Sequence, residues 1–445
     1  MAISMVFMRK QKDIRAQRNV ADYGAGWYNG VQTNAEGADM DISRKSFFIG
    51  SAAVVAATSL KAAAPNPVGK IQGFDESNEA KTDGPWEPFS DKKVRVGIAG
   101  YGVCTFGAVF SFQDHPNVEV VAATDLDPER CKKLAQVVHA KRTYPSAEEM
   151  IDKEGKNMDA VFIATDAASH ADLVLRALDR GYHVCSAVPA LLGERQLDRA
   201  PKMIEAVKKS GRVYALFETT AFRPQAIAMR RIYKAGGFGQ MVYTEGEYFH
   251  LNNPGGKGIG SYKGWRVGLP PQYYPTHSNG FYTCVTHGHF TEVTCVGTPD
   301  ENPIYKERKN PYQNPFRSEV AFFKTSEGGS ARMTVAWGLP GYHGELGRCF
   351  GTKGCFRNDR FAGDNSLIKG LKLIRTGLPP GMKNNGHHGG SHPYLTDDFL
   401  RAILVPGHKV CVDVATALNT TVAGVYAHLS ALKGGETLKI PVFSV

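Results

Sequence analysis

From residue 92 onward the sequence predicts an α/β fold that begins with a parallel sheet covered by helices on both faces. Short runs of Val, Ile and Ala alternate with helical stretches such as residues 169–180. A strand buried on both faces needs a continuous apolar run, and alternation with helices is typical of a parallel sheet. The strands expected on this basis are residues 94–99, 118–124, 159–165, 183–188 and 212–217.

The turn after the first expected strand is rich in glycine. Two glycines there allow the backbone to turn sharply and to approach a pyrophosphate. The third glycine of the G-x-G-x-x-G pattern is replaced by Thr105, and Gly107 follows two positions later. The residues expected to contact a cofactor in this turn are Gly100, Tyr101, Gly102 and Val103.

An acidic residue, Asp125, follows the second expected strand. A carboxylate at this place accepts hydrogen bonds from ribose hydroxyls and repels a 2′-phosphate. The sequence therefore predicts a Rossmann domain over residues 92–217 that binds NAD. Arg130 lies close enough in sequence to keep NADP as the less favoured alternative.

Residues 40–64 have the three-part pattern of an export signal. Arg44 and Lys45 precede an uncharged stretch from Phe47 to Leu60, and three alanines end at Ala64. The stretch is shorter than the roughly 20 residues that span a bilayer. It resembles a twin-arginine signal with Lys in place of the second Arg, so we expect an exported, periplasmic protein, cytoplasmic if the signal does not function.

The rest of the segment before the first strand is expected to carry no folded domain. Residues 1–39 are expected to be a disordered extension or a mis-assigned start, and residues 65–91 a linker. The chain of 445 residues has a net charge of +10, and residues 1–90 contribute none of this excess. A basic surface steers anions, but no basic cluster or nucleic-acid motif is present. The sequence thus indicates a small-molecule partner rather than a nucleic acid.

The order of motifs beyond residue 92 resembles that of the Gfo/Idh/MocA oxidoreductase family. The segments that carry the resemblance are VGIAGYG (96–102), IATDAASH (163–170), HVCSAVPA (183–190), GFGQMVYTEGEY (237–248), YPTHS (274–278), FGTKGCF (350–356), GGSHPYLTDDFLRAI (389–403) and LSALKGGETLKIPVF (429–443). The resemblance implies a second α/β domain over residues 218–445, with an open, largely antiparallel sheet and a C-terminal helix and strand within 410–443. Such sheets often form oligomer interfaces, so a homo-oligomer is expected. The resemblance adds Thr165, His170, Val188 and Pro189 to the cofactor-binding residues.

Two departures from the family pattern concern proton transfer. The family's dehydrogenases carry Glu-Lys-Pro where this chain has Ala187, Val188 and Pro189. The family's catalytic His is retained as His277, but Tyr273 stands where an Asp is usual. The resemblance therefore implies carbohydrate oxidoreductase chemistry without the usual Lys.

A branch of NAD-dependent glycosidases resembles the chain more closely. The similarity lies in residues 188–190, 245–250 and 274–277, although Phe222 stands where that branch has an active-site Tyr. Such enzymes oxidise C3 transiently, which acidifies the C2 proton and permits elimination at C1, and the hydride then returns. The alternatives are a simple sugar or polyol dehydrogenase that exchanges NAD(H), and a catalytically silent nucleotide- or sugar-binding protein.

This chemistry needs a base close to the sugar hydroxyl. His277 is the expected base because histidine titrates near neutral pH, with Tyr274 as a relay or hydroxyl contact and Lys263 as a replacement for the missing Lys. Trp265 and Arg266 suit stacking and hydrogen bonding to a sugar. Candidates for a second proton-transfer group are His250, His287, His289 and His392, of which His250 and His392 are also expected to bind substrate. No metal is expected, although the histidines in the loop over residues 387–392 leave a metal site as an alternative.

Overall fold

The computed structural model describes residues 84–102, 104–250, 262–339, 343–382 and 387–445. The predicted extension, the predicted signal peptide, most of the predicted linker and Val103 lie outside the described residues. Within the described residues no helix is both long and apolar enough to cross a membrane. The last part of the predicted linker is anchored, because the Trp86 indole N–H donates to Asp397 over 2.7 Å.

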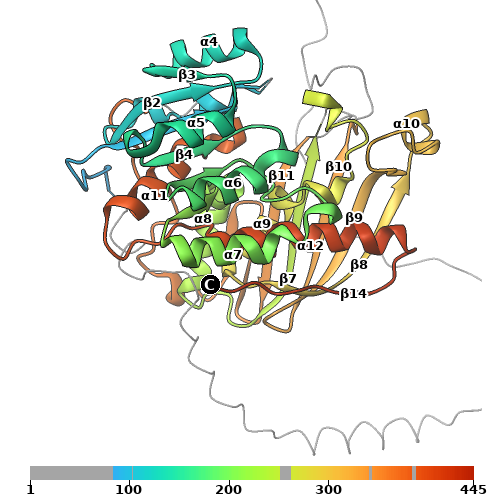
Figure 1. The fold of residues 1–445 in the computed structure, drawn as a ribbon. Helices are drawn as coiled ribbons and strands as arrows, with labels where there is room; N and C mark the ends of the chain where they lie inside the picture. Colours follow the sequence, from blue (N-terminus) through green and yellow to red (C-terminus); the bar gives the residue numbers. More distant parts are fainter. Residues whose placement is uncertain (1–83, 103, 251–261, 340–342, 383–386) are drawn as a thin grey trace, which may run out of the picture. The chain divides into compact units, whose positions relative to one another are not determined.

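The first domain is built on a six-stranded parallel sheet with the strand order β3-β2-β1-β4-β5-β6 (Figure 1). Its strands are β1 (Val94–Ala99), β2 (Val118–Thr124), β3 (Arg142–Tyr144), β4 (Ala160–Ile163), β5 (His183–Ser186) and β6 (Tyr214–Leu216). Its helices are α3 (Phe106–Val109), α4 (Pro128–Val137), α5 (Ala147–Glu154), α6 (His170–Asp179) and α7 (Arg199–Ser210). The predicted Rossmann fold is confirmed. The strand order reverses between β1 and β4, and in open α/β sheets this is where ligands bind.

The second domain has an eight-stranded mixed sheet with the order β13-β12-β11-β7-β10-β9-β8-β14. Its strands are β7 (Met241–His250), β8 (Phe290–Pro299), β9 (Phe316–Thr325), β10 (Ser330–Trp337), β11 (Gly344–Gly351), β12 (Gly354–Arg357), β13 (Arg360–Gly363) and β14 (Leu438–Lys439). β7 and β10 run parallel and the other neighbouring pairs are antiparallel. The expected open, largely antiparallel sheet is therefore confirmed.

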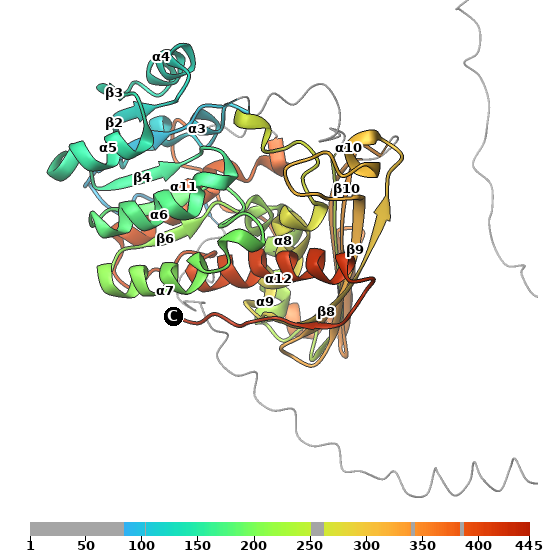
Figure 2. The ribbon, with the colours of Figure 1, turned by 45° about the vertical axis from the view of Figure 1, so that its right-hand side comes forward.

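Helices pack on one face of this sheet (Figure 2). They are α8 (Pro224–Lys234), α9 (Thr276–Thr286) and α12 (Val414–Leu432). The short α10 (Pro303–Lys306) follows β8 in the chain. Gly246 on β7 allows α9 to come close, since a Cβ there would lie 2.1 Å from the Ser278 carbonyl oxygen. This close packing fixes the N-terminal turn of α9, which carries His277.

Helix α11 (His392–Leu404) returns to the first domain. Leu395, Phe399 and Leu400 lie in one buried cluster with residues of β1, β2 and β4. The Thr396 hydroxyl also donates to the Phe110 carbonyl over 2.7 Å. The sequence assigned this helix to the second domain, whereas its buried side chains complete the core of the first.

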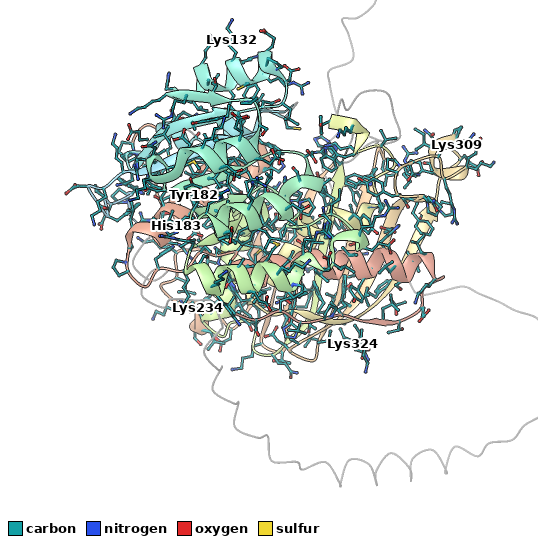
Figure 3. All side chains as sticks on the ribbon, in the orientation of Figure 1. Lys132, Tyr182, His183, Lys234, Lys309 and Lys324 are labelled. Atoms are coloured by element: carbon teal, nitrogen blue, oxygen red, sulfur yellow. The ribbon has the colours of Figure 1, made fainter. Side chains whose placement is uncertain are left out.

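Lysine side chains are carried by elements of both domains. Figure 3 labels Lys132 on α4, Lys309 after α10 and Lys324 on β9, at separate places on the surface. Lys309 pairs with Glu307, and Lys324 pairs with Glu292.

Candidate functional site

A buried histidine–glutamate pair lies at the carboxyl end of the first sheet. Glu218 follows β6 and is fully buried, and His277 on α9 is 2% exposed. The Nδ1 of His277 lies 2.8 Å from the Glu218 Oε1. The same carboxylate oxygen accepts the backbone N–H of Thr220 over 2.7 Å, so Glu218 also caps the short helix η5 (Thr219–Phe222).

Each partner shifts the pKa of the other. Burial alone would raise the pKa of Glu218, but the neighbouring His277 lowers it to about 2. Burial alone would lower the pKa of His277, but the negative charges of Glu218 and Glu345 outweigh burial and raise it. A carboxylate on Nδ1 fixes the orientation of an imidazole and directs its Nε2 away from the pair.

Aromatic residues surround the His277 ring. The ring centroid of Tyr248 lies 4.7 Å from that of His277, and the centroid of Tyr274 lies 5.5 Å away. Trp337 contacts both tyrosines, at centroid distances of 5.9 and 6.3 Å. A buried aromatic surface next to a titratable nitrogen is suited to hold the apolar face of a sugar ring.

A cationic group lies beside this aromatic surface. The Arg266 guanidinium stacks on the Trp265 ring at 4.2 Å and lies 5.7 Å from the Tyr274 ring. Trp265 and Arg266, which the sequence predicts to bind a sugar, therefore lie next to the site, because Arg266 contacts Tyr274. Lys263 is exposed, and its ammonium lies over the ring of Tyr262.

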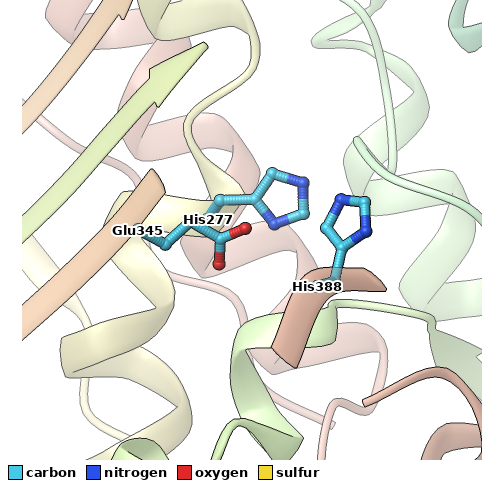
Figure 4. Close-up of side chains that lie close together, drawn as sticks. All are labelled: His277, Glu345 and His388. Atoms are coloured by element: carbon cyan, nitrogen blue, oxygen red, sulfur yellow. The ribbon is translucent and has the colours of Figure 1, made fainter. Parts of the chain in front are cut away.

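A second set of side chains approaches His277 from the other side. Glu345 on β11 accepts from the Arg223 Nε over 2.5 Å and from the Thr220 hydroxyl over 3.1 Å. One ligand-type atom each of His277, Glu345 and His388 lies within 4.8 Å of the others. Figure 4 shows the two imidazoles turned toward one another, with the Glu345 carboxylate beside the His277 ring.

The glycine turn is built as a Rossmann nucleotide site requires. Gly100 has φ +98°, and a Cβ there would lie 2.5 Å from the Ala164 carbonyl oxygen. Gly102 has φ +59°, and a Cβ there would meet no atom within 4 Å. The first glycine is therefore required by close packing, while the backbone at the second is open to a phosphate.

Asp125 organises this turn. Its Oδ2 accepts the backbone N–H groups of Tyr101 and Gly102, over 2.8 and 2.9 Å, and its Oδ1 accepts that of Asp127 over 2.9 Å. The sequence suggested ribose hydroxyls as the partners of this carboxylate. The structure adds a role in holding the loop, and the residues fit a dinucleotide whose ribose would lie at the end of β2.

The helix after the turn is a single turn long. Thr105, at the third glycine position, has φ +54°, and Ser111 has φ +59°, so α3 is a single turn between two left-handed residues. A Cβ at Gly107 would lie 2.5 Å from the Gly100 carbonyl oxygen. Gly107 thus provides the close packing that the motif assigns to its third glycine.

The remaining predicted cofactor contacts lie at the ends of β4 and β5. The ring nitrogens of His170 lie 2.9 Å from the Pro189 carbonyl and 3.2 Å from the Thr165 carbonyl. His170 therefore links the two strand ends. The Val188–Pro189 peptide bond is cis, and the Thr165 hydroxyl contacts Ser169 at 2.7 Å.

Two of the other histidine candidates lie near the site, because His250 contacts the aromatic residues around His277 and the His392 ring lies 5.0 Å from that of His388. His250 contacts Tyr248 and Trp337, and burial lowers the pKa of His250 to about 4. His392 packs edge-on against Phe110 at 4.5 Å. His287 ends α9 and His289 precedes β8, so both lie at the far end of the helix from His277.

Sequence reasoning missed Glu218 and Glu345, and it identified His388 only as part of the His-rich loop. Glu218 carried a usable signal, because an acid directly after an apolar parallel strand lies at the edge where active sites form. Glu345 and His388 come from a different strand and a distant loop, and no spacing relates them to His277.

The fold and the glycine turn define a two-domain protein of the NAD-binding Rossmann class. Residues 94–217 match the model of the Gfo/Idh/MocA oxidoreductase family, which has an NAD-binding Rossmann fold.

Curated relatives carry the name glycosyl hydrolase family 109 protein. One from Bacteroides fragilis is 32% identical over 165 residues, which is 35% of this chain and 35% of the relative. One from Saccharopolyspora erythraea is 24% identical over 290 residues, 60% of this chain and 62% of the relative. The matched part thus spans about a third of the length of the first relative.

Solved structures share the fold. An apo scyllo-inositol dehydrogenase from Lactobacillus casei has a TM-score of 0.62 at 15% identity, covering 79% of this chain and 99% of that one. An oxidoreductase from Agrobacterium radiobacter, in complex with NAD+, L-tartaric acid and magnesium, has a TM-score of 0.58 at 16% identity, covering 78% and 98%. At these identities the likeness concerns the fold alone.

Proposed function

We propose that the protein is an NAD-dependent oxidoreductase that acts on a carbohydrate at the site around His277. The observation that carries the proposal is the buried His277–Glu218 pair at the carboxyl edge of the Rossmann sheet. Its imidazole is held through Nδ1 and lies against Tyr248 and Tyr274. The family of the first domain supports the cofactor.

The proton chemistry follows from this arrangement. Bound NAD supplies the hydride acceptor for a carbon that carries a hydroxyl. His277 takes the proton of that hydroxyl through Nε2, and Glu218 holds the ring and stabilises the imidazolium, a contribution typical of general-base catalysis. The family Lys is replaced by Val188, so the base comes from the second domain.

Substrate orientation is assigned to the surrounding side chains. Tyr248, Tyr274 and Trp337 form an apolar wall, and Arg266 lies at its edge. A sugar presents one apolar face and a rim of hydroxyls, which matches a wall of rings beside a guanidinium. We assign the ring contact to the aromatic wall and hydroxyl binding to Arg266.

The finer proposal is a redox-neutral glycoside hydrolase that recycles its cofactor. The relatives named glycosyl hydrolase family 109 support it. The twin-arginine-like segment over residues 40–64 favours export in the folded state, with NAD already bound. Outside the cytoplasm a nicotinamide serves many turnovers only if the hydride returns to the product.

The outward face of the second sheet favours self-association. Val296 on β8 and Phe322 on β9 are 59% and 51% exposed. Exposed large apolar side chains on a sheet face are typical of interaction surfaces. We propose that copies of the chain associate through this face, which sedimentation of the wild type and of Phe322→Lys would test.

The test of function begins with protein purified without added nucleotide. The protein is denatured, and released NAD and NADH are quantified in the supernatant. The native protein is then given p-nitrophenyl glycosides of glucose, galactose and N-acetylgalactosamine in both anomers, while p-nitrophenol and reduced nicotinamide are followed together. Near-stoichiometric cofactor with phenol release and no accumulating NADH supports the hydrolase.

Other outcomes decide between the alternatives. Steady NADH production that needs added NAD identifies a simple sugar or polyol dehydrogenase. An absence of both signals with every glycoside, and with free sugars and inositols, identifies a silent binding protein and overturns the proposal.

A further inference from the structure

Arg375 is braced against the loop that faces His277. One N–H group of its guanidinium donates to the Gly389 carbonyl over 2.7 Å, and another donates to the Phe222 carbonyl over 3.2 Å. Gly389 follows His388, whose ring centroid lies 5.5 Å from that of His277 (Figure 4). The Arg375 guanidinium therefore lies at the border of the site around His277.

An aromatic ring helps to fix this guanidinium. Its Cζ lies 4.9 Å from the centroid of the Tyr394 ring, and Tyr394 stacks on Phe222 with an interplanar angle of 10°. The Tyr394 hydroxyl donates to the Thr376 carbonyl over 2.9 Å, which holds the ring in place. A guanidinium that is already oriented loses less entropy for each hydrogen bond it forms with a ligand.

In the part of the chain that the structure describes, no carboxylate pairs with Arg375. Its hydrogen bonds there go to two backbone carbonyl groups. A carbonyl oxygen satisfies a hydrogen bond but does not neutralise a charge. Burial lowers the pKa of Arg375, and the positive charge of Arg223 adds to this lowering, while Tyr394 opposes it. The positive charge of Arg375 is therefore unbalanced.

Arg223 places a second guanidinium next to the first. Its Nε donates to the Glu345 carboxylate over 2.5 Å, and both of these side chains are mostly buried. A Cβ at Gly389 would lie 3.3 Å from the Arg223 Nη1, so this guanidinium reaches the loop that Arg375 also holds. Two guanidinium groups thus share one carboxylate, and one positive charge is left over.

The same loop carries a polar atom without a protein partner. The Nδ1 of His388 is buried and makes no hydrogen bond with any described residue. A buried polar atom in this state costs free energy unless a ligand or water satisfies it. The unbalanced charge and the unsatisfied nitrogen both indicate that a ligand completes this side of the site.

We propose that the sugar bound at this site carries an anionic group, a carboxylate or a sulfate ester, which Arg375 and Arg223 bind together. The inference rests on the proposed function and names the class of its substrate. Arginine binds carboxylates and phosphates through paired N–H···O bonds, and a sulfate ester presents the same kind of oxygen atoms as a phosphate. The net charge of +10 acts in the same direction, because it attracts anionic substrates.

The first test uses the wild type and pairs of substrates that differ only at C6. The p-nitrophenyl glucosides are compared with the glucuronides of the same anomer, and the p-nitrophenyl N-acetylgalactosaminides with their 6-sulfates. We expect the anionic member of one pair to exceed its neutral partner by about 10–100-fold in kcat/KM, mainly through KM, which is the effect of hydrogen bonds to a charged group. The pair that shows this preference distinguishes a carboxylate from a sulfate ester.

The second test removes the unbalanced charge. Arg375→Gln should lower the ratio of anionic to neutral kcat/KM by about 10–100-fold. Arg375→Lys keeps the charge without the planar fork, so its ratio should lie between those of Arg375→Gln and the wild type. The matched control is Arg231→Gln, because Arg231 also donates to backbone carbonyls, those of Lys372 and Ile374 in the same segment. It should keep the wild-type ratio, and thermal unfolding establishes that all three variants fold.

Two further measurements do not depend on turnover. Titration calorimetry with D-glucuronate, D-galactose 6-sulfate and the two neutral sugars measures affinity for the anionic group directly. This affinity should be higher than that for the neutral sugar, and it should fall in Arg375→Gln and with rising salt concentration. The NAD content of the purified variants should match that of the wild type, because the dinucleotide is assigned to the turn around Gly100 and Gly102.

Several results would overturn the inference. They are a preference for the neutral member of both pairs, an anionic preference that persists in Arg375→Gln, and an equal loss of activity toward both members of a pair in that variant. Loss of NAD from Arg375→Gln would assign the cation to the cofactor instead. A wild type that is inactive with every substrate of both pairs overturns the proposed function and the inference with it. A wild type that is active with the neutral substrates alone overturns only the inference.

Discussion

Two buried histidine–glutamate pairs in this protein have the same chemistry and different surroundings. The Nδ1 of His277 lies 2.8 Å from Glu218, and the Nδ1 of His428 on α12 lies 2.6 Å from Glu319 on β9. All four side chains are almost completely buried. The distance and burial of a pair therefore do not distinguish a catalytic histidine from a structural one.

The surroundings distinguish the two pairs. The second oxygen of Glu319 accepts the backbone N–H of Gln272 over 2.7 Å, and the His428 ring packs against Tyr273 and Phe316. That pair ties α12 and β9 to the segment before α9. The His277 ring instead faces His388 and the aromatic wall. A histidine that faces other titratable groups at a sheet edge is the better candidate for catalysis.

The largest expected effect is a loss of turnover when the histidine of the first pair is replaced. His277→Ala should lower turnover by about 10²–10⁴-fold, because a general base is lost, while it folds and retains NAD. Turnover with the best glycoside and the NAD content of the purified variant check this. Wild-type-like turnover would remove the functional distinction between the pairs.

The next largest effect is a loss of unfolding free energy when the histidine of the second pair is replaced. His428→Leu leaves a buried Glu319 oxygen without its hydrogen-bond partner, which costs about 1–3 kcal/mol of unfolding free energy. Urea unfolding measures the loss, and turnover per folded molecule should stay within a few-fold of the wild type. An unchanged unfolding midpoint would show that the pair does not stabilise the fold.

Asp125 sharpens the comparison, because this carboxylate is held by amides rather than by a histidine. Asp125→Ala removes the acceptor of two loop N–H groups, so NAD affinity should fall by roughly tenfold or more. Asp125→Asn keeps an acceptor oxygen and should lose less, while both should admit NADP more readily. Titration calorimetry with both nucleotides checks this, and equal affinities in all three proteins would refute it.

The smallest effect comes from a third pair. Burial lowers the pKa of His408, but the hydrogen bond to Asp398, over 2.7 Å, outweighs burial and raises it. The pair should thus add stability below the unfolded pKa of about 6.5, and this stability is lost as the pH rises through the folded pKa. Between pH 5 and about 9 the melting temperature of His408→Gln should fall less steeply with rising pH than that of the wild type. Melting temperatures of the two proteins that change in parallel with pH would contradict this.

The fold was predictable where burial dictates sequence. Continuous apolar runs identified five of the six parallel strands, because those strands are covered on both faces. The strand β3 was missed because its residues, Arg142 to Tyr144, are mostly exposed at the sheet edge. The end of α3 could not be predicted, because left-handed conformations at Thr105 and Ser111 leave no clear pattern in sequence.

The site was predictable in part. His277 and Tyr274 come from one contiguous segment, which made them visible. Glu218, Glu345 and His388 come from the end of a strand in one domain, a strand in the other and a late loop. Their proximity is a tertiary property, and no spacing in the chain encodes it.

The return of α11 to the first domain has a consequence for biosynthesis. Leu395, Phe399 and Leu400 pack with the first strands of the sheet, roughly 300 residues earlier in the chain. While the ribosome is still making the second domain, the nucleotide-binding half is an open sheet without one of its covering helices. Cofactor capture is then expected late in synthesis. A fragment ending at residue 217 should expose that face to chaperones rather than fold as an independent NAD-binding module.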